Sequence, residues 1–165
     1  MPHQPPVLFR PYQSSDLAFV ASSWLLSYRS SQPTKYIGND DYYATLHPLV
    51  EALARGVRGT GTATTLLAVN PEDSDQIYGW VSYGHLGPVP VLHYVYVKEL
   101  FRRQKIATQL LDQAGFTHGS AFFYTFLPRG AEHLRPLYPA AAYNPFLLFQ
   151  VKTEWQPQAN ELSPP

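Results

Sequence analysis

The chain has 165 residues, of which 45% are hydrophobic and 15% aromatic, and its formal net charge at pH 7 is zero. This length suits one domain with a substantial core, and the composition excludes a largely disordered chain. A general nucleic-acid-binding surface is not favoured, because phosphate backbones attract clustered Lys and Arg. The chain has no cysteine, which excludes disulfides, thiolate nucleophiles and cysteine-ligated zinc.

No apolar run approaches the ~20 residues that a membrane span requires. The first ten residues, MPHQPPVLFR, lack the charged and apolar regions of a signal peptide. We therefore expect a cytoplasmic protein with no membrane association. We expect residues 1–155 to form a single domain and residues 156–165, which contain prolines, to form a flexible tail.

In the first half of the chain, residue patterns predict one strand, a helical region and then a strand pair. The strand covers 7–10, and a helix capped by Ser14 or Ser15 runs to about Tyr28. A second helix begins near Asn39, and Pro48 either starts a third helix or kinks one longer helix. Strands at 64–70 and 77–84 follow, separated by the turn sequence PEDSD.

The second half alternates shorter elements. We expect a strand at 91–97, a helix at 103–114, a strand at 121–127, a short helix ending near Tyr138 and a last strand at 143–151. Strands and helices mix without strict βα alternation. The sequence therefore predicts a mixed α/β (α+β) fold, with a largely antiparallel central sheet flanked by helices.

A basic cluster formed by Arg102, Arg103 and Lys105 joins the strand at 91–97 to the following helix. A helix N-terminus offers free N–H groups and a positive dipole, so added cations favour a phosphate or pyrophosphate site. The competing interpretation is a solvated first turn. Cations at this end of a helix oppose the macrodipole and cost stability, which favours a functional explanation.

Two segments resemble motifs of the GNAT superfamily of N-acyltransferases. Residues 102–107, RRQKIA, follow Tyr96-Val97 and resemble the acetyl-CoA-binding pattern Arg/Gln-x-x-Gly-x-Gly/Ala, with Lys105 in place of Gly. Residues 137–143, LYPAAAY, resemble the family's Phe-Tyr-x-x-x-Gly-Phe, with Ala142 for Gly and Tyr143 for Phe. The order of elements is also the family's order, so the resemblance covers about residues 7–150.

This resemblance implies a GNAT-like fold and transfer of an acetyl group from acetyl-CoA, a co-substrate, to an amine by direct attack in a ternary complex. It implies a small-molecule or peptide amine as acceptor, and a homodimer is a further expectation. Backbone groups of one strand would hold the pantetheine arm and polarise the thioester carbonyl. The implied cofactor-binding residues are Val95, Val97, Arg102, Arg103, Gln104, Lys105, Ile106 and Ala107.

Two residues are the catalytic candidates. Tyr138 lies in the second motif, and a phenol with a pKa near 10 keeps its proton at neutral pH and can protonate a departing thiolate. His93 is the first candidate for the base because imidazole suits proton abstraction at neutral pH, and strand alternation places it on the face of Val95 and Val97. The alternatives are a tethered half-buried tyrosine and a packed core histidine. No metal site is expected.

Aromatic residues are the candidates for holding the acceptor: Trp24, Tyr28, Tyr83 and Tyr94. Such rings can cradle a cation or a planar group. The alternative for Trp24 and Tyr28 is a place in the core. The sequence does not separate a peptide N-terminus from a lysine, a polyamine, an antibiotic amine or an aminated nucleotide.

Two other functions remain open. Lys105, and Ala131 where the family commonly has Asn, also fit a degenerate, non-catalytic GNAT fold that acts as a binding, inhibitory or virion-associated module. The other open function is that of a phage member of the family that modifies DNA bases. The zero net charge argues against this function. An open cleft between splayed strands at 91–97 and 121–127, ending at the 102–107 turn, would favour the enzyme, and a closed or filled cleft would favour the inert module.

Overall fold

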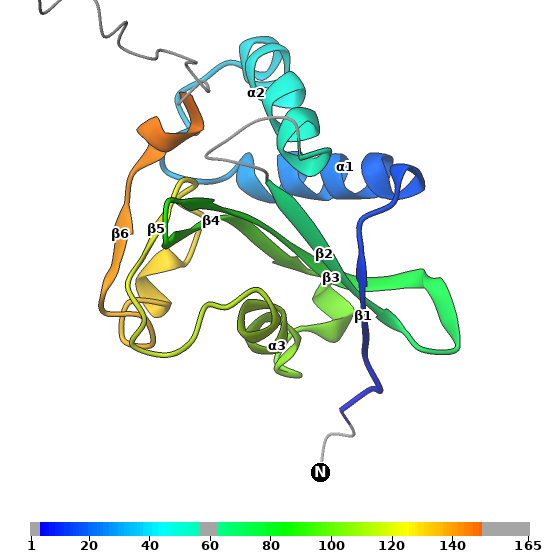
Figure 1. Ribbon diagram of the computed structural model, residues 1–165. Coiled ribbons are helices and arrows are strands. Elements are labelled where there is room, and N and C mark those ends of the chain that lie inside the picture. The colour runs from blue at the N-terminus through cyan, green and yellow to red at the C-terminus, as the bar shows by residue number, and fades with distance from the viewer. Residues whose placement is uncertain (1–3, 57–62, 150–165) are drawn as a thin grey trace, which may run out of the picture.

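The computed structural model describes residues 4–56 and 63–149, and its centre is a six-stranded sheet whose strands follow chain order (Figure 1). The strands are β1 Leu8–Pro11, β2 Thr64–Asn70, β3 Asp73–Leu86, β4 Val89–Val97, β5 Phe122–Tyr124 and β6 Ala141–Tyr143. The first four pair antiparallel, whereas β5 is parallel to β4 and β6 is parallel to β5. The predicted mixed α/β fold with a largely antiparallel sheet is confirmed.

Helices cover both faces of the sheet (Figure 1). Helices α1 (Leu17–Tyr28) and α2 (Asn39–Ala54) pack on one face around Trp24 and Trp80, and α3 (Ile106–Gln113) packs on the other. Each face therefore has its own buried apolar cluster, and the strands between them contribute side chains to both. None of the helices in the described ranges is long and apolar enough to cross a membrane.

Several element bounds differ from the sequence-based expectations for local reasons. Pro48 lies inside a single helix, α2, whose buried residues on either side keep one face toward the core. Strand β3 is longer than 77–84, because it forms hairpins with both β2 and β4. The short helix expected before Tyr138 is a 3-10 turn at Ala131–His133 followed by further turns.

The predicted last strand at 143–151 is wrong. Strand β6 ends at Tyr143, and Pro145–Phe149 forms a 3-10 helix. Proline has no N–H to donate to a strand ladder, so Pro145 ends the pairing. The expected tail at 156–165 lies outside the described residues.

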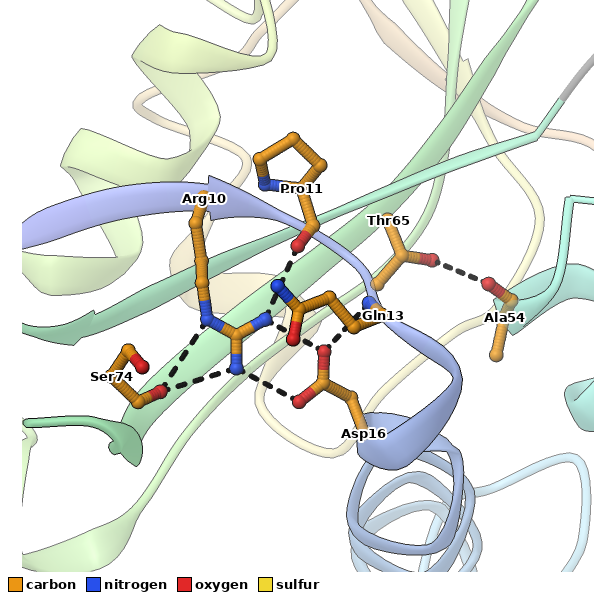
Figure 2. A network of polar contacts seen from close by, with 7 residues as sticks. All are labelled: Arg10, Pro11, Gln13, Asp16, Ala54, Thr65 and Ser74. Carbon is orange, nitrogen blue, oxygen red and sulfur yellow. Dashed lines mark hydrogen bonds and ion pairs between the residues drawn. The ribbon is translucent and has the colours of Figure 1, made fainter.

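A buried ion pair joins β1 to the start of α1 (Figure 2). Both guanidinium ends of Arg10 donate to Asp16, with Nη1–Oδ2 at 2.7 Å and Nη2–Oδ1 at 2.9 Å. The Gln13 N–H also donates to Asp16, and Arg10 reaches the carbonyl of Ser74 on β3. Burial alone would raise the pKa of Asp16, but the hydrogen bonds from Arg10 and Gln13 outweigh it and lower that pKa.

We expect Asp16→Asn to lower the free energy of unfolding by about 3 kcal/mol at pH 7, because it leaves a largely buried guanidinium without its counter-charge. The lowered pKa means that the pair stabilises the fold above the ordinary value of 3.8 and loses this effect as the pH falls below it. Urea titrations at pH 7 and pH 3 measure both effects. The exposed Glu72→Gln is the control, and equal stability of the two variants at pH 7 would contradict the prediction.

Candidate active site

The central strand β4 carries one extra residue, His93. Tyr94 pairs with Ser82, and Leu92 pairs with Tyr83. Neighbouring residues of β3 therefore pair with residues of β4 that are two positions apart, and His93 lies between them without a partner on β3. This is a β-bulge, which bends a strand and changes which side chains share a face. Leu92 therefore joins the apolar cluster on the α3 face, where Val95 and Val97 also pack. The strict alternation assumed for His93 does not hold at this point.

Beyond the bulge, β4 separates from β5. The parallel ladder has two pairs, Val91–Phe123 and Leu92–Tyr124, and the Thr125 N–H then donates to the Leu92 carbonyl at 3.0 Å. No backbone hydrogen bond joins these strands after Thr125 within the described chain. Strand β5 is consequently much shorter than the expected 121–127.

A cleft occupies the opening between β4 and β5. Its walls come from β4, β5, α3 and the segment between Ala131 and Ala141. Its lining residues are Leu92, His93, Tyr94, Val95, Leu111, Phe122, Tyr124, Phe126, Pro128, Ala131, Leu134, Arg135, Tyr138 and Ala141. The wall is almost entirely apolar, and Arg135 is its one cationic residue. The structure thus brings His93, Tyr94, Val95 and Tyr138 together.

His93 lines this cleft and is buried and neutral. Its Nδ1 lies 2.9 Å from the Thr125 hydroxyl, and its Nε2 has no hydrogen-bond partner among the described residues. Burial lowers the pKa of His93 to about 4. This is the packed histidine with one satisfied nitrogen that the sequence left open. Its role as a base stays a prediction, since an imidazole with so low a pKa accepts a proton weakly.

Tyr138 also lines the cleft. Its side chain is 8% exposed and its ring meets Phe122 edge-on, with ring centroids 5.5 Å apart. Burial raises the pKa of Tyr138, and the charge of Asp112 raises it further. The phenol therefore keeps its proton at neutral pH, and no described residue accepts a hydrogen bond from it. A group with these properties is suited to donate a proton inside an apolar cleft.

The turn between β4 and α3 adopts a backbone that normally needs glycine. Arg103 has a φ of 62° and Lys105, at the N-cap of α3, a φ of 61°. No side chain caps this helix, so its first N–H groups remain free for a ligand. Left-handed backbone at residues other than glycine costs about 1–2 kcal/mol each and tends to persist at functional sites.

Lys105 thus keeps the conformation that glycine favours, although the side chain is not that of glycine. In addition, neither Arg103 nor Lys105 forms an ion pair within residues 4–56 and 63–149. An uncapped helix start flanked by free cations is suited to an anion. None of the residues 102–107 lines the cleft itself.

The remaining predicted residues are dispersed. Trp24 and Tyr28 are 0% and 5% exposed. They belong to the core, which was the alternative interpretation of these two residues. Tyr83 packs against Phe116 and does not line the cleft. Arg102 lines a second, open groove beside α1, together with Phe19, Ser22, Ser23, Leu26, Ser27 and Tyr96.

Some lining residues were not found from the sequence. Phe126 lies just beyond β5, in a run that predicted an unbroken strand, so nothing marked it as a cleft residue. Arg135 lines the cleft from a run of turns, where no helical or strand spacing marked it. No group of three or more potential metal ligands occurs in the described part of the chain.

Comparison with known proteins gives matches among solved structures. No protein-family model matches the chain, and no curated protein sequence matches it significantly. The similar structures are acetyltransferases of the GNAT family, the family that the two motifs resemble. A GNAT acetyltransferase from Staphylococcus aureus Mu50 has 21% identity and a TM-score of 0.47 over 66% of this chain and 63% of its own.

Two further matches are similarly distant. A GCN5-related N-acetyltransferase from Rhodopseudomonas palustris has 19% identity and a TM-score of 0.47, over 70% of this chain and 66% of its own. The PaiA N-acetyltransferase from Thermoplasma acidophilum, in complex with coenzyme A, has 13% identity and a TM-score of 0.46, over 67% of this chain and 70% of its own. The chain spans just under two thirds of the first two proteins.

Replacement of Lys105 separates backbone strain from charge. We expect Lys105→Gly to raise the free energy of unfolding by about 0.5–1 kcal/mol, because glycine adopts a positive φ without strain and the gain exceeds its entropic cost. Lys105→Ala removes the same charge but keeps the strain, so it should not stabilise. Thermal unfolding of the three proteins measures the difference. Equal melting temperatures for the Gly and Ala variants would contradict a strained turn.

The burial of His93 predicts a specific pH dependence of stability. Its folded pKa of about 4 lies below the ordinary value of 6.5, so its contribution is complete above pH 6.5 and is lost as the pH falls toward 4. Relative to His93→Asn, the wild type should lose about 3 kcal/mol of unfolding free energy over that range. Urea titration of both proteins from pH 7 to pH 4 gives this difference, and parallel pH profiles would show that His93 titrates normally.

Proposed function

We propose that this protein transfers an acetyl group from acetyl-CoA to an amine acceptor in a ternary complex. The observation that carries the proposal is the cleft that the His93 bulge opens between β4 and β5. Tyr138 lies on its wall, and an uncapped, cation-flanked helix start follows the same strand. Together these features offer an apolar slot for an extended arm, a proton donor inside it and an anion site beyond it.

The cofactor would bind along β4. The pyrophosphate sits on the free N–H groups at the start of α3, with Arg103, Gln104, Lys105, Ile106 and Ala107 around it. The pantetheine arm runs into the cleft. Because β4 has no β5 partner after Leu92, backbone groups of Val95 and the N–H of Val97 are left to bond the amides of the arm, whereas the Val97 carbonyl already accepts from Arg102.

In the transfer step, the amine nitrogen attacks the thioester carbonyl carbon. A backbone N–H of β4 stabilises the oxyanion that forms. The C–N bond forms, the C–S bond breaks, and the sulfur leaves as a thiolate that takes the phenolic proton of Tyr138. The attacking nitrogen gives up one proton, for which His93 is the candidate acceptor because it is neutral at pH 7.

One observation favours the second candidate function, a non-catalytic binding module. On the α1 face the opening is filled by aromatic rings: Trp24 stacks on Tyr94 with centroids 5.3 Å apart, and Phe126 contacts both rings. A cofactor can therefore enter the cleft from the α3 face. An acceptor that approaches from the α1 face meets these rings. Turnover of an amine distinguishes the enzyme from the module.

The test of the enzyme is Tyr138→Phe. If Tyr138 protonates the thiolate, kcat should fall about 10²-fold or more, within the range for a positioned acid. The Kd for acetyl-CoA should change little, because the hydroxyl acts on the departing sulfur. Steady-state kinetics with release of free CoA, together with calorimetry, measure both quantities.

The matched control is Tyr124→Phe, which removes a hydroxyl from another tyrosine of the same cleft. It should retain most of the turnover. Full activity of Tyr138→Phe would remove Tyr138 from the mechanism. Tight acetyl-CoA binding without turnover of any amine by the wild type would favour the binding module.

A further inference from the structure

The groove beside α1 has the chemistry of an acceptor site for one class of amine. We propose that it binds an amine carrying an anionic group, a carboxylate or a phosphate, and that Arg102 recognises the anion. This inference rests on the proposed acyl transfer and names its substrate class. It also assigns Arg102 to the acceptor and not to the cofactor.

The positive end of the groove is built by residues that follow or end β4. Nε of Arg102 donates to the Val97 carbonyl at 3.1 Å, which holds the guanidinium at the groove and leaves both Nη groups without a described partner. Nζ of Lys98 lies 4.7 Å from the ring centre of Phe19, another lining residue. No carboxylate lines the groove, and neither cation forms an ion pair in the described ranges.

The serines of α1 provide the opposite chemistry. Ser22, Ser23 and Ser27 donate their hydroxyl protons to the carbonyls of Phe19, Val20 and Ser23. Ser23 also accepts from the Trp80 indole at 2.9 Å. With their protons committed to the helix, Ser22 and Ser27 present only oxygen lone pairs to the groove. Lone pairs accept hydrogen bonds from an amine, so this wall complements N–H groups as Arg102 complements an anion.

Tyr94 connects this groove to the cofactor cleft. Its ring lines the cleft, and its hydroxyl lies 3.0 Å from Oγ of Ser27, a residue of the groove. Since the Ser27 proton goes to the Ser23 carbonyl, Tyr94 is the donor of this bond. The nearby charge of Arg102 also acts on Tyr94, opposing the rise in its pKa that burial causes. Tyr94, packed against Trp24 and Phe126, therefore lies between the two pockets.

These contacts give each part of the ligand a partner in the groove. The anion lies with Arg102, and the amine lies against the oxygen lone pairs of Ser22 and Ser27. A polycation such as a polyamine would place a second positive charge against Arg102 and Lys98. The groove therefore selects amino acids, short peptides or amino phosphates over polyamines.

The experiment compares matched amines by calorimetry in the absence of cofactor. Glycylglycine is compared with glycylglycinamide, and phosphoethanolamine with ethanolamine, so that each pair differs in the anionic group. The wild type should bind at least one anionic member about 10-fold or more tightly than its neutral partner, and the pair that shows the preference identifies carboxylate or phosphate. Arg102→Ala should abolish the preference, and Arg102→Lys should retain part of it.

Acetyl-CoA binding is measured in parallel. Arg102→Ala should leave the Kd for acetyl-CoA within about threefold, whereas the control Arg103→Ala should weaken acetyl-CoA and spare the anionic amine. Equal affinity for charged and neutral amines, or an anionic preference that survives Arg102→Ala, would overturn the inference. Selective amine binding through Arg102 by a protein that does not bind acetyl-CoA would uphold the groove and refute the proposed acyl transfer.

Discussion

The contact on which the site depends is the hydrogen bond between His93 and Thr125, at the point where β4 and β5 part. His93 is the extra residue of the bulge, and Thr125, the residue just after β5, is the last whose N–H still reaches β4. Before this point β4 and β5 are paired in the sheet, and after it they are not hydrogen-bonded to each other in the described chain. The cleft, the free backbone edge of β4 and the course of the chain into the basic turn all follow from that separation.

A consequence is that β4 serves two pockets with different chemistry. On the α3 face, Leu92 and Val95 line an apolar cleft that contains one cation. On the α1 face, Tyr96 borders an open groove of serines and Arg102. The aromatic packing around Tyr94 separates the two. In the proposed reaction, apolar contacts hold the extended arm of the cofactor and charge holds the acceptor. Tyr94 borders both pockets.

The fold class could be predicted from the sequence because it depends on local patterns: the strand at 64–70 matches β2, and the apolar spacing after Ile106 identifies α3. The bulge could not, since alternation around His93 looks regular until the register with β3 is known. The early end of β5 and the course of Arg102 toward α1 are likewise set by tertiary contacts. Tyr138 was found because a motif marked it, whereas Arg135 belongs to the same cleft without a motif of its own.

The most direct test of the account is a crystal structure of the protein with acetyl-CoA. It predicts the pyrophosphate at the N-terminus of α3, the pantetheine arm between β4 and β5, and the thioester sulfur within hydrogen-bonding distance of the Tyr138 hydroxyl. It also predicts that the groove beside α1 stays free of cofactor. Cofactor bound in that groove, or on a surface away from the separation of β4 and β5, would contradict the account.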